Sequence, residues 1–356
     1  MAKPWTLDFK HGHQSATIDG VCVYLLEPAV LDPRTRKGKP SALDHKHTVG
    51  PLVNAQARPL VQGRPVRVFI DPGHGGADSG ALSQDRKLVE SRVVLDIAKR
   101  LAAYLAQTGF DVKLSRQDNT TSLLLEERTF LAARWKADIF VSIHINATAD
   151  GDPGAYGLET FILPPAGACS TYGRSASTDA QKGNGNDVRN MQLGFAIQRR
   201  TVKTSKMADR GLRRARFTVL RDAPMPAALV ECGFISSPRD RKILNTAEGR
   251  ERLARGIFQG ICDYAYGTLA PGLPAHAPGG KDTAVGSTTP PPINKDATPT
   301  PIAPRRPVVL HGTNLPDKVV VPNRKPAWTP PPIPEDKKED PRLQKIREEA
   351  ARAAGF

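Results

Sequence analysis

The sequence has few cysteines, no long apolar run and no recognisable leader peptide. Its four cysteines form no CxxC pair, which argues against a cysteine zinc site, and Cys232 and Cys262 lie in apolar surroundings typical of small buried residues. No segment is long and apolar enough to span a membrane. The N-terminal stretch MAKPWTLDFKHGHQ lacks the apolar core of a signal peptide. Taken literally, the chain stays in the cytoplasm; the alternatives are a removed or mis-called leader and another export route.

Acidic residues are also scarce, since 36 Asp and Glu stand against 51 Lys and Arg and leave a net charge of +15. Such a surface favours polyanions, which include nucleic acid, anionic lipid and acidic cell-wall polymer. Charge alone cannot choose among them. The chain has no aromatic-and-basic motif of the common RNA-binding modules and no cysteine–histidine finger, so we do not expect a nucleic-acid partner.

Composition divides the 356 residues into three parts. Residues 1–64 include ATIDGVCVYLLEP, a strand pattern with a turn at Asp19-Gly20, so we expect a small β-rich appendage or a strand added to the main sheet. Residues 268–356 are proline-rich and polar, a composition that cannot bury enough apolar surface to offset chain entropy. We expect a disordered tail with a short terminal helix, which tethers the protein to the wall or to an activator, or is a spacer.

Residues 65–267 alternate helix-like and strand-like runs. Apolar residues at helical spacing predict helices at 88–109, 123–137, 190–205 and 249–265. Short apolar or β-branched runs predict strands at 66–70, 110–116, 138–146, 157–164, 217–221 and 227–231. Thr121 and Ser122 are capping candidates for the second helix. This order predicts an α/β fold, with a central, mostly parallel or mixed sheet flanked by helices.

Four side chains at element ends could carry chemistry, although each has a structural alternative. His74 lies on a glycine-rich turn after a strand, where α/β sheets place their sites. His144 lies in an apolar strand and, taken alone, is more typical of a core histidine. Glu90 opens a helix, where the helix dipole favours a carboxylate. Glu231 ends an apolar strand and would be costly to bury without a partner.

Together these residues make sense as one site. Two imidazoles and one carboxylate are the ligand set of a hydrolytic zinc centre with an open fourth position for water. Zinc lowers the pKa of that water to roughly 7, and Glu231 could accept the water proton and pass it to the departing amine. The four residues come from four segments, so no local spacing rule tests the grouping.

Several separated motifs resemble those of the zinc-dependent type 3 N-acetylmuramoyl-L-alanine amidases. They are VFIDPGHGGADSGA, LSRQD, LEERTFLAARWKADIFVSIHINA and FTVLRDAPMPAALVECGFISSPRD, in the family's order. The resemblance implies His74, Glu90 and His144 as ligands of one Zn²⁺ per chain and Glu231 as the catalytic carboxylate. It implies a sheet of about six strands and, as substrate, the peptidoglycan amide between N-acetylmuramic acid and L-alanine.

The resemblance carries further expectations. Arg116 and Arg128 lie at family-like positions, where we favour a structural ion pair over substrate contact. Asn146 could orient a ligand or the substrate. Residues 164–189 show no apolar period for a helix that would cover the site, so we expect an open cleft. The family also implies a place in the periplasm or cell envelope and a part in cell division and cell separation.

Two other functions fit the same residues. A zinc peptidase acting on stem peptides would use the same ligands, and an inactive relic could bind wall polymer through its basic surface. Because all the motifs lie within residues 65–267, we also expect that part to fold and cleave alone.

Overall fold

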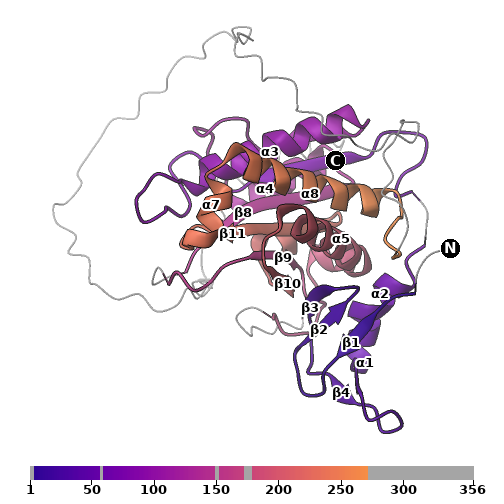
Figure 1. The fold of residues 1–356 in the computed structure, drawn as a ribbon. Helices are drawn as coiled ribbons and strands as arrows, with labels where there is room; N and C mark the ends of the chain where they lie inside the picture. Colours follow the sequence, from indigo (N-terminus) through magenta and orange to yellow (C-terminus); the bar gives the residue numbers. More distant parts are fainter. Residues whose placement is uncertain (1–3, 57–58, 149–151, 172–178, 272–356) are drawn as a thin grey trace, which may run out of the picture.

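The computed structural model of the protein describes residues 4–56, 59–148, 152–171 and 179–271 (Figure 1). Its central element is a nine-stranded sheet with the order β1-β2-β3-β10-β9-β11-β8-β6-β7. Helices pack on both faces of the sheet, which confirms the predicted α/β fold. Within the described residues, no helix combines the length and the apolar character that a membrane span needs.

Six strands of the sheet come from residues 67–234. They are β6 (Arg67–Pro72), β7 (Asp111–Leu114), β8 (Ile139–Asn146), β9 (Leu158–Ile162), β10 (Asp209–Arg214) and β11 (Ala227–Phe234). Strands β7, β6, β8 and β11 run parallel, whereas β9 is antiparallel to β11 and β10 is parallel to β9. The sheet is therefore mixed, and this part of it has the strand number that the family resemblance implies.

The larger core lies between one face of the sheet and three long helices. These are α3 (Glu90–Gln107), α5 (Asp187–Ser205) and α8 (Ala247–Ala265). A Cβ added to Gly256 or Gly260 of α8 would lie 2.5 Å from a Cα atom of α5, so these glycines let the two helices approach closely.

A smaller core covers only part of the opposite face. It packs under α4 (Leu125–Arg134) and α6 (Thr218–Arg221) and includes Phe140 of β8 and Leu229 of β11. Because side chains alternate along a strand, His144 and Glu231 point to the same face as these two residues. The apolar core thus gives way to polar residues toward the carboxyl ends of β8 and β11. Helix α7 (Pro238–Leu244) follows β11.

The N-terminal segment extends the sheet instead of standing apart from it. Its elements are β1 (Leu7–Phe9), β2 (Ser15–Ile18), β3 (Val21–Tyr24), β4 (Val30–Leu31), β5 (Gly38–Lys39), α1 (Ala42–Asp44), the π-helix η1 (His45–Val49) and α2 (Gly50–Val53). Asp19 and Gly20 both have positive φ, as a tight hairpin turn between β2 and β3 requires. Strand β3 then pairs in parallel with β10, which joins the segment to the rest of the sheet.

A buried arginine fastens this junction. The Arg214 side chain at the end of β10 donates to the carbonyl oxygens of Tyr24 and His47, at 3.0 Å each, and to the Thr48 hydroxyl. Arg214 is 1% exposed, and burial lowers its pKa to about 10, so it remains charged at neutral pH. The N-terminal segment therefore supplies the acceptors that a buried guanidinium needs.

Two local predictions were wrong. Residues 217–221 were expected to form a strand, but Thr218–Arg221 form helix α6, while the charged strand β10 just before it was not predicted. Its sequence DRGLRR shows little apolar alternation because arginines occupy positions on both faces. The tail and its terminal helix, predicted for residues 268–356, lie outside the described residues beyond position 271.

The cap of helix α4 also differs from the prediction. Leu124, not Thr121 or Ser122, precedes the helix, and the Glu127 carboxylate accepts from the Leu124 N–H at 2.6 Å. The Thr121 hydroxyl donates to Asp118 instead. The acidic residue in the first turn, rather than a preceding hydroxyl, satisfies the start of the helix.

A chain shortened to residues 65–356 tests the role of the N-terminal segment. Its loss would uncover Leu212 and Phe195 and remove the acceptors of Arg214; each uncovered large side chain costs about 1.5–3 kcal/mol. Since domains are stable by only about 5–15 kcal/mol, we expect no cooperative thermal unfolding, unlike the full-length chain. Equal melting temperatures for both chains would instead support independent folding of residues 65–267.

Candidate metal centre and catalytic carboxylate

His74 is presented by a strained turn after β6. Its φ is +61°, in the left-handed region that non-glycine residues rarely adopt. Its Nδ1 lies 2.7 Å from the Asp78 carboxylate, and its Nε2 lies 3.0 Å from Glu90 Oε1. Burial opposes charging of the ring, but the contacts with Glu90 and Asp78 outweigh it and raise the His74 pKa. Asp78 thus fixes the ring so that Nε2 faces Glu90.

Glu90 is the first residue of α3, and its side chain is almost completely buried. It does not cap its own helix. One oxygen accepts from the Ala81 N–H at 2.8 Å, and the other accepts from the Ile145 N–H at 3.0 Å. Burial alone would raise the pKa of this carboxyl, but the imidazoles of His144 and His74 lower it far below its usual range. Glu90 is therefore ionised at neutral pH.

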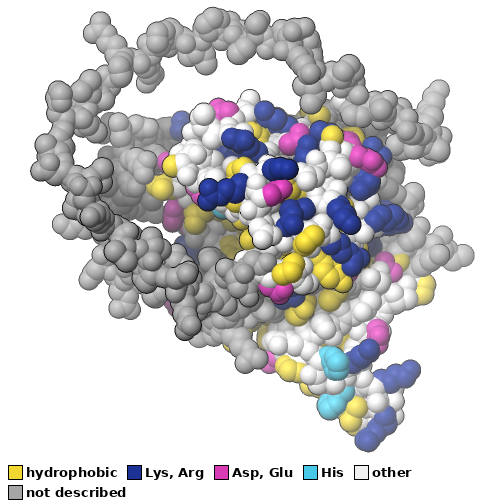
Figure 2. Space-filling view, turned by 60° about the vertical axis from the view of Figure 1, so that its left-hand side comes forward, with side chains coloured by type: hydrophobic (Ala, Val, Ile, Leu, Met, Phe, Trp, Pro, Cys, Tyr) yellow, Lys and Arg dark blue, Asp and Glu magenta, His cyan; other side chains and the backbone are white. Residues whose placement is uncertain are grey.

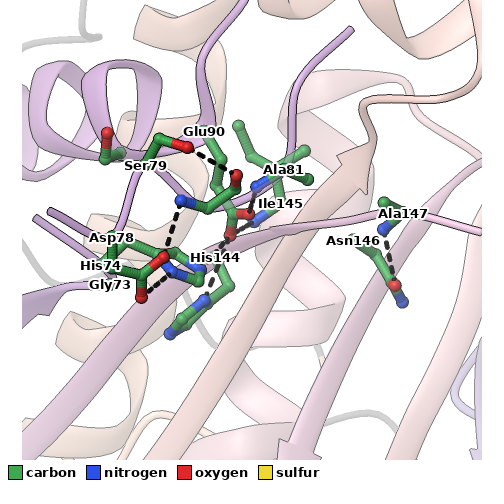
Figure 3. A network of polar contacts seen from close by, with 12 residues as sticks. Gly73, His74, Asp78, Ser79, Ala81, Glu90, His144, Ile145, Asn146 and Ala147 are labelled. Carbon is green, nitrogen blue, oxygen red and sulfur yellow. Dashed lines mark hydrogen bonds and ion pairs between the residues drawn. The ribbon is translucent and has the colours of Figure 1, made fainter. Parts of the chain in front are cut away.

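His144 completes a cluster of three. Its Nδ1 lies 3.2 Å from Glu90 Oε1, and its ring centre is 4.9 Å from that of His74 (Figure 3). The ring is half-buried near the end of β8, so His144 is not the apolar-core histidine that its strand alone suggests. Figure 3 shows both rings and the Glu90 carboxylate converging from three different elements.

The three side chains fit a zinc ion. One ligand atom from each lies within 4.8 Å of the others. Ligands about 2.0–2.1 Å from one tetrahedral ion lie roughly 3.4 Å from each other, so small movements would suffice. Two imidazole nitrogens and one carboxylate oxygen are donors that zinc prefers in open, catalytic sites.

Glu231 lies beside this cluster. Strand pairing places it next to His144 on one side and next to Glu159 on the other. Its Oε2 is buried, and no described residue hydrogen-bonds to it. Burial, and then the carboxylates of Glu90 and Glu159, raise the Glu231 pKa well above its usual range. A carboxyl in this setting keeps its proton to a higher pH than a solvent-exposed glutamate does, which favours a part in proton transfer.

Glu159 is a site residue that the sequence analysis missed. It is 1% exposed, and it accepts from Asn146 Nδ2 and from Arg210 Nε, at 3.1 Å each. It also forms an ion pair with Arg213, whose Nε lies 2.8 Å away. Asn146 therefore contacts Glu159, and Figure 3 shows it away from the histidines. A lone glutamate in the apolar strand GLETFIL was the signal that could have found it.

Arg116 and Arg128 stabilise the turn that carries His74. Arg128 forms a buried ion pair with Asp71 at 2.7 Å, and it also donates to the His74 carbonyl. Arg116 instead donates to the carbonyls of Pro72 and Gly73. The arginines act on main-chain atoms of the turn and keep His74 in its strained conformation.

Two glycines make room for the cluster. A Cβ at Gly73 would lie 2.2 Å from the His144 ring, and one at Gly80 would lie 2.6 Å from the Glu90 carboxylate. Close approach therefore requires both glycines, and Gly80 also has a φ of +66°, which favours glycine.

The predicted absence of a covering helix is tested only in part. Between positions 164 and 189, the described residues include the 3₁₀ helix η2 (Lys182–Asn186) and the start of α5, whereas 172–178 lie outside them. The open cleft stays a prediction.

The mixed α/β sheet, a His–Glu–His cluster that could hold a metal ion and the neighbouring buried acid are the arrangement expected of a hydrolase. The chain belongs to the N-acetylmuramoyl-L-alanine amidase family, whose sequence model matches residues 68–263. It is 33% identical over 225 residues to N-acetylmuramoyl-L-alanine amidase AmiA of Escherichia coli (strain K12), covering 56% of this chain and 76% of that protein.

Two further proteins are similar to the chain. The chain is 35% identical over 198 residues to the sporulation-specific N-acetylmuramoyl-L-alanine amidase of Bacillus subtilis (strain 168), covering 55% of this chain and 67% of the relative. A solved N-acetylmuramoyl-L-alanine amidase from Clostridium difficile 630 shares 36% identity and a TM-score of 0.48, covering 57% of this chain and 97% of the other.

Gly73→Ala tests the geometry of the cluster. The added methyl group would displace the His144 ring, so we expect zinc affinity to fall by about 10–100-fold, with the circular dichroism spectrum unchanged. Gly185→Ala is the matched control, because a Cβ there meets nothing within 4 Å. Titration with a competing chelator measures the affinity. Equal zinc affinity of the two variants would contradict the assignment of His144.

Proposed function

We propose that the chain hydrolyses the amide bond between N-acetylmuramic acid and L-alanine in bacterial peptidoglycan, with one zinc ion held by His74, Glu90 and His144. Family membership supports the substrate. The observation that carries the mechanism is Glu231, whose buried oxygen lacks a partner among the described residues beside three converging ligand groups. Burying an acid without a hydrogen-bond partner lowers the stability of the fold, and such residues are concentrated at functional sites.

The division of labour follows from the contacts. Zinc, when bound, polarises a carbonyl and lowers the pKa of a water molecule. Asp78 holds the His74 ring, and the main-chain N–H groups of Ala81 and Ile145 hold Glu90, so the ligands are oriented in advance.

Glu231 moves the proton. As the water oxygen bonds to the carbonyl carbon, the Glu231 carboxylate accepts the proton that the water loses. It then gives this proton to the alanine nitrogen as the carbon–nitrogen bond breaks, so the products are a muramic acid carboxyl group and a free peptide amine.

The charge of the molecule agrees with such a substrate. On the face in Figure 2, Lys and Arg side chains are more prominent than acidic ones over much of the described surface, and the net charge is +15. A basic surface attracts anionic wall polymers at a distance. We propose that the protein acts in the periplasm or cell envelope, in cell division and cell separation, and that its tail contacts wall or an activator.

Digestion of purified sacculi tests the substrate. We expect the zinc-loaded protein to release peptides with a new L-alanine amine and to leave the glycan strands intact, as read by mass spectrometry. Free stem peptides should stay uncut. Cleavage within those peptides would indicate a zinc peptidase, and binding without cleavage would indicate a wall-binding relic.

Glu231→Gln tests the proton acceptor. Glutamine keeps the shape but cannot accept the proton, so we expect turnover on sacculi to fall by about 10²–10⁴-fold. Zinc content should stay at one ion per chain, because Glu231 is not a ligand. A variant that retains wild-type turnover would refute the role, and one that loses zinc would make Glu231 part of the metal site.

A further inference from the structure

Two arginines lie on the same face of the sheet as Glu231. Glu231 pairs with Glu159 of β9, and Glu159 pairs with Gly211 of β10. Arg210 and Arg213 flank this glycine along β10. Neighbouring strands are about 4.8 Å apart, so the arginines lie roughly 10 Å across the sheet from the proposed catalytic carboxylate.

A β-bulge brings both arginines to this face. The register of β10 against β9 shifts between Asp209 and Gly211, which makes Arg210 the extra residue. As a result the Nε atoms of Arg210 and Arg213 lie 3.1 and 2.8 Å from the same Glu159 oxygen, although regular alternation would send residues three apart to opposite faces. Bulges often redirect side chains beside functional sites.

Two guanidinium groups face the single carboxylate of Glu159, and Asp240 also interacts electrostatically with Arg210. The Arg213 side chain is 14% exposed, whereas that of Arg210 is 34% exposed. Arg210 Nε donates to Glu159, and its guanidinium lies 4.8 Å from the Phe234 ring centre. Within the described part of the chain, its two terminal nitrogens donate to no protein acceptor. The contacts with Glu159 and Phe234 hold the guanidinium in place, and the two terminal nitrogens remain available to bind a ligand.

The N-terminal segment holds the more buried arginine. Arg213 Nη2 donates to the Tyr24 hydroxyl at 2.7 Å, and its guanidinium lies 3.8 Å from the centre of the Tyr24 ring. Tyr24 is the last residue of β3. Strand β3 therefore extends the row of polar residues that runs from Glu231 through Glu159 to Arg213. Its Tyr24 holds the Arg213 side chain in this position.

We propose that Arg210, backed by Arg213 and Tyr24, binds a carboxylate on the peptide side of the substrate. The inference rests on the proposed amidase function. A guanidinium fork recognises carboxylates in a bidentate manner. An extended chain advances about 3.3–3.6 Å per residue, so an acidic group within roughly three residues of the cleaved bond would reach Arg210.

Paired substrates test this subsite. Two soluble muramoyl-tripeptides, both amidated at the C-terminus, would differ only in the second residue of the peptide, glutamate or glutamine. We expect the wild-type KM to be about tenfold lower for the acidic substrate, as a charge-assisted hydrogen bond predicts. Arg210→Gln should raise that KM about tenfold with kcat unchanged and abolish the preference, and Arg210→Lys should restore most of it.

Arg239→Gln is the matched control. This arginine also lies over an aromatic ring, 4.3 Å from the centre of Tyr156, and it does not contact Glu159. It should keep both KM values. A wild-type enzyme without preference, or an Arg210→Gln variant whose KM rises equally for both substrates, would overturn the subsite.

Calorimetric binding of both compounds to the Glu231→Gln protein separates the two proposals. If the acidic compound binds better, and Arg210→Gln in the same background removes the difference, the subsite stands even if the wild type cleaves neither compound. Equal binding overturns the subsite, even where cleavage of both compounds upholds the amidase function.

Discussion

The carboxylate of Glu90 is the contact on which the site depends. One of its oxygens faces both imidazoles, at 3.0 and 3.2 Å, and the group is buried where an isolated charge would be costly. Main-chain N–H groups from two other segments hold it, so the loop before α3, the helix itself and β8 are fixed relative to one another. The cluster that could bind a metal thus also links three segments of the fold.

Strand pairing then determines which residues lie beside the His74–Glu90–His144 cluster. Because β11 is parallel to β8 and antiparallel to β9, His144, Glu231 and Glu159 form one row across three strands. The row continues through the bulge of β10 to Tyr24 in β3. Tyr24 therefore lies on the same face of the sheet as the proposed catalytic carboxylate. A domain boundary at residue 64 would assign the two residues to different domains.

The sequence singles out three of the four principal residues because each breaks its local pattern, whereas Glu90 fits the start of a helix. His74 interrupts a glycine-rich turn, and His144 and Glu231 are polar positions in apolar strands. It does not predict Glu159 or the roles of Gly73 and Arg210, since their importance lies in contacts between strands that are distant in sequence. Strand β10 was missed for a related reason. Its buried arginines, Arg213 and Arg214, contact Glu159, Tyr24 and main-chain carbonyls, so apolar periodicity does not reveal that the strand is buried.

Anomalous diffraction from crystals grown with zinc tests the central claim most directly. The account predicts one peak above the absorption edge, about 2.0–2.2 Å from a nitrogen of His74, a nitrogen of His144 and an oxygen of Glu90, with Glu231 adjacent but not bound. Zinc held by other residues, or no peak among these three, would contradict it.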